Sequence, residues 1–145
     1  MSVTQTTPIS KFRKSMSGFL TKLRTWANRD QLKELEKFEL KYNMGMKVNP
    51  RDSLLFFIET LEPYANHILK GDDEYFLREH IEVEDEYHSL SQQLKVWWPS
   101  LEQAQQNYIK TQFKLLLMLG AIATKHENLR TVINQYRDPD NQLVY

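Results

Sequence analysis

The 145-residue sequence contains no cysteine, which excludes a disulfide framework, a zinc–thiolate centre and a cysteine nucleophile. It has only four glycines, too few for a phosphate-binding loop built on several of them. The 19 basic and 19 acidic residues cancel, so the net charge indicates no particular class of partner. A chain of this length most commonly forms one domain whose core is large enough to be stable without disulfide bonds.

Long apolar runs are also missing. The run Leu115–Ala123 is too short to span a membrane, which takes about 20 apolar residues. Residues 1–29 carry six basic residues and no acid, a composition shared with mitochondrial transit peptides. We favour a helix of the folded domain over mitochondrial targeting for this stretch, and the sequence leaves the localisation open.

Residues 101–123 are predicted to form the central helix of the fold. Apolar residues follow the spacing of three and four that marks one helical face, as Ile109, Phe113 and Leu116 illustrate. From Leu115 onward the apolar residues no longer keep to one side. A helix that is apolar all round must be enclosed by other elements, so we expect the remaining segments to pack around this one.

Start and stop signals divide the rest of the chain into further helices. Asn28 and Gln31 have the spacing of a capping box, and Asn49-Pro50 combines a cap with a proline in the first turn. Pro63 should interrupt the helix that follows, and Gly71 should end it. The pattern predicts an all-α fold: one domain over residues 1–145, an irregular bundle of about six helices, with loose tails at 1–7 and 138–145.

The helix expected from Pro8 onward is the main candidate for a binding surface. Its basic residues are Lys11, Arg13, Lys14, Lys22 and Arg24. They could contact an acidic protein, nucleic acid phosphates or an anionic membrane surface, or they could form the solvated face of a core helix. Trp26 and Trp97 are possible interface anchors, because tryptophan is enriched at binding hot spots.

The segment 72–86 is acidic, and its negative charges could neutralise the positive charges of the basic helix within the molecule. This region and its flank also hold Asp85 and His88, one helical turn apart. A di-iron bundle needs two Glu-x-x-His motifs and two further glutamates, and the sequence holds only this Asp-x-x-His. We therefore interpret the segment as an acidic surface and predict no metal site.

No pattern of residues typical of an enzyme is present. The sequence has no Gly-x-Ser-x-Gly elbow and no paired carboxylates in an apolar setting. His67 and His126 are isolated histidines on helical segments, which favours surface or capping roles over catalysis. We expect a non-enzymatic protein without a cofactor.

Several short stretches of the sequence together resemble a pattern found in a known group of proteins. Asn49-Pro50, Pro63-Tyr64 and the Asp-Glu-Tyr-Phe stretch at 73–76 resemble a pattern in small helical proteins of large nucleocytoplasmic DNA viruses. The similarity extends over roughly residues 32–123, where Trp98 precedes the apolar run as a tryptophan does in those proteins. Those proteins have no assigned activity, so the resemblance implies a viral setting and a helical fold, and it carries over no functional residue.

Together these observations predict a helical protein-interaction module, a virion-associated or assembly component whose partners are other proteins. The alternative is a nucleic-acid-binding protein that uses the basic helix. In a viral setting the protein would be found in the virion or in the host cytoplasm or nucleus. The sequence leaves the oligomeric state open.

Overall fold

The computed structural model describes residues 7–72 and 94–145. Within these ranges the regular elements are helical, and no strand is present. The α-helices are α1 (Pro8–Trp26), α2 (Arg29–Val48), α3 (Pro50–Leu61), α4 (Ala65–Lys70), α7 (Gln103–Thr124) and α8 (Glu127–Asn134). The described residues also form three 3₁₀ turns. The turn η1 (Glu62–Tyr64) joins α3 to α4, η2 (Trp98–Ser100) precedes α7, and η3 (Pro139–Asn141) follows α8. The predicted all-α bundle is thereby confirmed.

The helix boundaries follow the capping signals in the sequence. The Asn28 side chain accepts a hydrogen bond from the Gln31 backbone at 2.9 Å, and the Gln31 side chain accepts one from the Asn28 backbone at 2.9 Å. Asn49 caps α3 by accepting from the Asp52 backbone N–H at 3.2 Å. Because these side chains satisfy N–H groups that the helix leaves unpaired, they fix where α2 and α3 begin.

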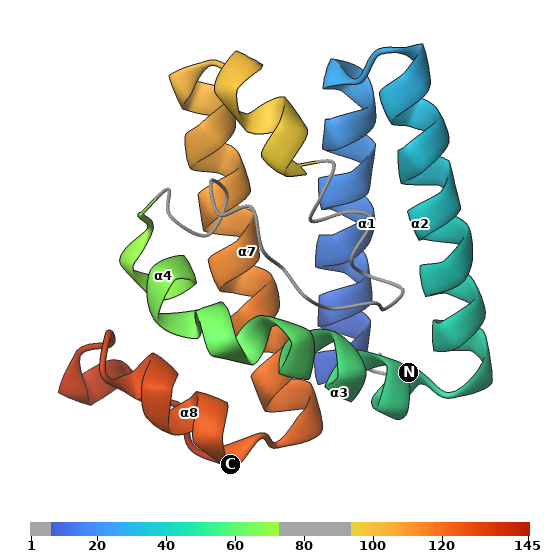
Figure 1. Ribbon diagram of the computed structural model, residues 1–145. Coiled ribbons are helices and arrows are strands. Elements are labelled where there is room, and N and C mark those ends of the chain that lie inside the picture. Colours follow the sequence, from blue (N-terminus) through green and yellow to red (C-terminus); the bar gives the residue numbers. More distant parts are fainter. Residues whose placement is uncertain (1–6, 73–93) are drawn as a thin grey trace, which may run out of the picture.

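Helices α1, α2 and α7 form the body of the molecule, and α3 crosses one end of it (Figure 1). Neighbouring helices in this group run in opposite directions, α1 against α2 and α1 against α7. Helix α7 contacts α1, α3, α4 and α8 and so occupies the central position predicted for it. Side chains from all these helices join one buried apolar cluster.

A glycine allows α3 to pack closely on α7. Gly120 lies in α7, where a Cβ atom would fall 2.3 Å from Cγ2 of Ile58 on α3. Carbon atoms in van der Waals contact are about 3.5–4.0 Å apart. The packing of α3 on α7 therefore depends on a residue without a side chain at position 120.

The segment 138–145 is attached to the bundle, which differs from the loose tail expected from the sequence. The Asn134 side chain accepts from the Leu143 backbone N–H at 2.8 Å and donates to the Leu143 carbonyl at 3.1 Å. Arg130 lies 5.0 Å from the centre of the Tyr145 ring. These contacts join Asn134 and Arg130 of α8 to Leu143 and Tyr145, nine and fifteen residues later in the chain. No local turn signal encodes such pairings.

At the other end of the described chain, Thr7 is the N-cap of α1, because its hydroxyl accepts a hydrogen bond from the Ser10 backbone N–H at 3.1 Å. Most of the acidic segment 72–86, together with His88, lies outside the described residues. The prediction that it neutralises the basic helix concerns this part of the chain.

Candidate binding surfaces

All five predicted basic residues of α1 are exposed, and they spread over half of the circumference of the helix. Lys11 and Lys22 are eleven residues apart, and so are Arg13 and Arg24. At about 100° per residue, the members of each pair point within about 20° of each other. The two pairs lie on opposite flanks of the helix, and Lys14 projects between them. The basic residues therefore cover the exposed half of α1 and reach two different sides of it.

The flank that carries Arg13 and Arg24 faces α2. Arg24 forms an ion pair with Glu39 of α2. Arg13 and Lys14 line a cleft between the two helices, described below. On the other flank, the Lys22 ammonium lies 6.0 Å from the centre of the Trp26 ring. Two of the five cations thus have contacts within the molecule.

The two tryptophans predicted as anchors pack into the fold. Trp97 is only 5% exposed, and its neighbour Trp98 is 2% exposed. Trp26 is half-buried and meets Tyr108 of α7 edge to face, with 5.5 Å between the ring centres. The structure thus places Trp97 in the core rather than on the surface, and Trp26 joins α1 to α7.

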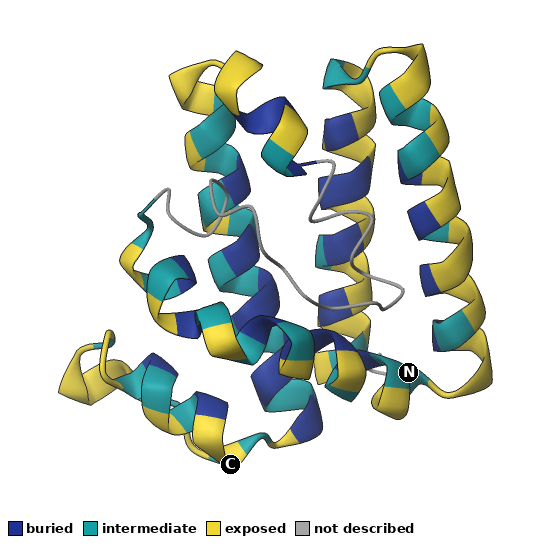
Figure 2. Cartoon of the chain, in the orientation of Figure 1, coloured by how far each residue is buried: buried dark blue, intermediate teal, exposed yellow. Residues whose placement is uncertain are grey.

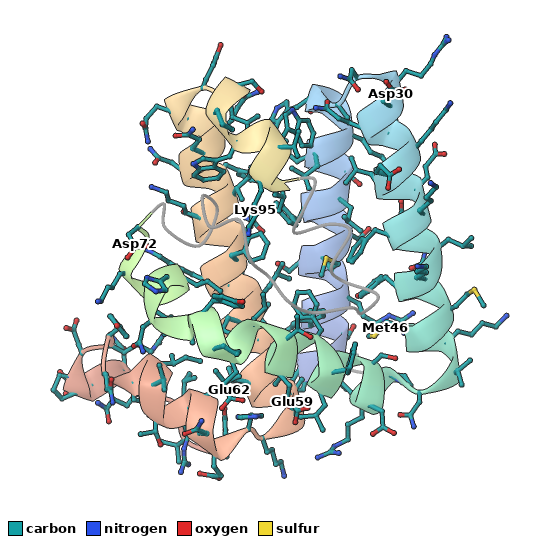
Figure 3. All side chains as sticks on the ribbon, in the orientation of Figure 1. Asp30, Met46, Glu59, Glu62, Asp72 and Lys95 are labelled. Atoms are coloured by element: carbon teal, nitrogen blue, oxygen red, sulfur yellow. The ribbon has the colours of Figure 1, made fainter. Side chains whose placement is uncertain are left out.

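The cleft between α1 and α2 has a volume of about 540 Å³. Arg13, Lys14 and Ser17 line it from α1, and Tyr42 and Asn43 line it from α2. Its position follows from Figure 3, which labels Met46 at the end of α2 that lies next to α3. Tyr42 comes one turn before Met46 along the helix. The cleft therefore opens near the N-terminal half of α1.

Tyr42 is the unusual residue of this cleft. Its side chain is stacked on Phe38 and 6% exposed, yet no residue in the described ranges is a hydrogen-bond partner of its hydroxyl. Burial raises the pKa of Tyr42 to about 12, while the positive charge of Arg13 acts in the opposite direction. The hydroxyl is consequently protonated at neutral pH and can donate a hydrogen bond.

A second surface lies on the outer side of α2, which Figure 2 shows as largely exposed. Leu40, Met44 and Val48 are 63%, 60% and 85% exposed. They are spaced four residues apart and therefore form one apolar stripe on the helix. The buried residues of α2, such as Phe38 and Tyr42, lie on the opposite face.

Positively charged residues surround this apolar stripe. The exposed lysines on the same outer half of α2 are Lys33, Lys37, Lys41 and Lys47. Glu36 is also exposed near its edge, and Lys37 hydrogen-bonds to Glu34 at 3.3 Å. The sequence contained a signal for this surface, because Leu40, Met44 and Val48 repeat with a helical period that is out of phase with the core residues.

A second cleft, of about 350 Å³, lies between α4, α7 and α8 and is lined mainly by apolar side chains, Leu115 and Met118 among them. Among the described residues, no group of three potential metal ligands comes together, and no helix is long and apolar enough to cross a membrane. Asp85 and His88, weighed above as metal ligands, lie outside those residues.

Comparison of the sequence with protein-family models and with curated proteins, and of the fold with solved structures, finds no match.

Proposed function

We propose that this protein is a non-enzymatic interaction module that binds another protein through the outer face of α2. The observation that carries the proposal is the exposed stripe of Leu40, Met44 and Val48. Apolar side chains in such a stripe lie on one helical face, as they do in helices that dock into a groove of a partner. The burial of that face against a partner would remove apolar surface from water.

The lysines around the stripe specify the chemistry of the partner. Two copies of α2 packed stripe to stripe would bring Lys37 and Lys41 close to the same residues of the second copy, and like charges across an interface are unfavourable. A partner with an apolar groove or helix face bordered by carboxylates would complement both the stripe and its rim. We therefore propose an acidic protein partner rather than self-association.

This proposal changes the part of the surface to which the function is assigned. The sequence favours the basic residues of α1, which cover the exposed half of that helix, and one of them, Arg24, is already paired with Glu39. The nucleic-acid-binding alternative would use this surface of α1. Association with a virion or another assembly remains an expectation from the viral resemblance.

The test is a capture experiment with the protein immobilised and extract from its native source. The triple variant L40Q/M44Q/V48Q removes the stripe while it keeps residues that tolerate a helix, since Gln has a helix propensity close to that of Leu and Met. The matched control, V96Q/V144Q, removes two apolar side chains that are 77% and 86% exposed elsewhere. Circular dichroism should show that both variants keep the helical fold.

We expect the wild type and the control variant to retain the same protein and the triple variant to lose it. The retained protein should carry an acidic surface, and raising the salt concentration should weaken its capture by screening the lysine rim. Equal capture by the triple variant would refute the assignment to α2. Retention that depends on nucleic acid, and is abolished by nuclease, would favour the nucleic-acid-binding alternative.

A further inference from the structure

The cleft between α1 and α2 is lined by a residue with a buried hydrogen-bond donor that no described residue pairs with. A buried polar group without a partner costs about 1–3 kcal/mol, so most such groups in folded proteins are paired. The Tyr42 hydroxyl is such an exception in a residue that lines a cleft. Nothing in the packing of the apolar ring on Phe38 requires this hydroxyl, since phenylalanine would pack equally well.

The same cleft is positively charged. Arg13 and Lys14 line it, and in the ranges 7–72 and 94–145 no carboxylate forms an ion pair with either of them. Glu39 also lines the cleft, but Arg24 neutralises it. The first turn of α1 adds the positive end of a helix dipole, because Ser10 lies at the cleft wall.

We propose that this cleft binds the phosphate group of a small molecule. The guanidinium of Arg13 presents several N–H donors in a geometry that suits phosphate oxygens, and Lys14 supplies a second charge. The Tyr42 hydroxyl has almost no accessible surface in the free protein, so binding must shift the side chains that cover it. After that shift the hydroxyl donates to a third phosphate oxygen, which gives the buried donor its partner. The volume of the cleft is also more than ten times that of a water molecule, which leaves room for an organic part beside the phosphate.

Calorimetric titration of the full-length protein tests the site with three probes: inorganic phosphate, glycerol phosphate and a nucleoside monophosphate. Citrate at matched ionic strength serves as the carboxylate comparison. We expect saturable binding of one equivalent of a phosphate-bearing probe, tighter than the binding of citrate. Equal affinity for all three probes would assign recognition to the phosphate alone, and a preference for one of them would identify the organic part.

Two substitutions and a matched control test the named contacts. Arg13→Gln removes a charge-assisted hydrogen bond and should weaken binding roughly tenfold or more, and Tyr42→Phe should weaken it roughly three- to tenfold. Lys11→Gln removes the same charge from the opposite flank of α1 and should change the affinity by less than about twofold. The Tyr42→Phe protein should be at least as stable as the wild type without ligand, because the unpaired hydroxyl is gone.

The absence of saturable binding of any phosphate-bearing probe would overturn the proposal. An equal loss in Lys11→Gln and Arg13→Gln would also overturn it, because that result would indicate general attraction of anions to α1. The triple variant of the α2 stripe changes no residue of the cleft and should bind phosphate like the wild type. The two proposals can therefore fail independently.

Discussion

The replacement of Gly120 by alanine tests the close packing of α7 on α3. The new Cβ would lie 2.3 Å from Cγ2 of Ile58, about 1.2 Å short of an ordinary carbon–carbon contact. Neither atom is at the end of a long flexible side chain, so α3 must shift from α7 or Ile58 must leave its preferred rotamer. Overpacking of this kind costs about 1–3 kcal/mol.

Helix propensity acts in the opposite direction at this position. Alanine is favoured over glycine in a helix by up to about 1 kcal/mol, which leaves a net destabilisation of up to about 2 kcal/mol for Gly120→Ala. Gly18 in α1 is the matched control, because a Cβ there meets no atom within 4 Å. Gly18→Ala should therefore stabilise the protein by up to about 1 kcal/mol.

Urea denaturation at 25 °C measures both changes in the free energy of unfolding, and thermal denaturation provides a check. For a chain of this size the Gly120→Ala protein should melt up to about 8 °C lower than the wild type, and the Gly18→Ala protein slightly higher. If Gly120→Ala stabilises the protein as much as Gly18→Ala does, α3 and α7 do not approach each other as closely as described.

The double variant with Ile58→Ala separates the clash from other effects. Ile58→Ala alone leaves a cavity and should cost about 2–5 kcal/mol. In the Gly120→Ala background the same change also removes the clashing Cγ2 atom, so it should cost less, with a coupling energy of about 1 kcal/mol or more. Additive effects would contradict direct contact between the two positions.

Two further predictions concern Tyr42 and the C-terminal segment. Since burial raises the pKa of Tyr42 from 10.0 to about 12, the folded protein retains this proton at a pH at which the unfolded chain loses it, and the stabilisation is lost as the pH rises from about 10 to 12. Tyr42→Phe should therefore lose roughly 1–3 kcal/mol less stability than the wild type over this interval, measured by urea denaturation at each pH, and parallel losses would contradict the assignment. Removal of residues 138–145 should lower the free energy of unfolding by about 1–3 kcal/mol, because the Asn134 side chain loses both hydrogen bonds to Leu143. A truncated protein as stable as the full chain would show that the segment is a loose tail after all.

Local chemistry made the helix boundaries predictable from the sequence. Asn28, Asn49 and Pro63 act on backbone groups within four residues of themselves, so their effects do not depend on the rest of the fold. The central position of α7 was predictable for a related reason, since an apolar helix has to be covered. The candidate site was less predictable, because a helical pattern shows which residues share a face but not what that face meets.

The sequence by itself determined the helical class, the capped starts of α2 and α3, the break at Pro63 and the central helix. The tertiary structure decided which exposed residues can act together. It turned the flank of α1 that carries Arg13 and Arg24 toward α2, and it left the Tyr42 hydroxyl buried beside a charged cleft. These outcomes depend on the direction from which α2 packs against α1. That direction is fixed by contacts between residues far apart in the chain, which no local pattern encodes.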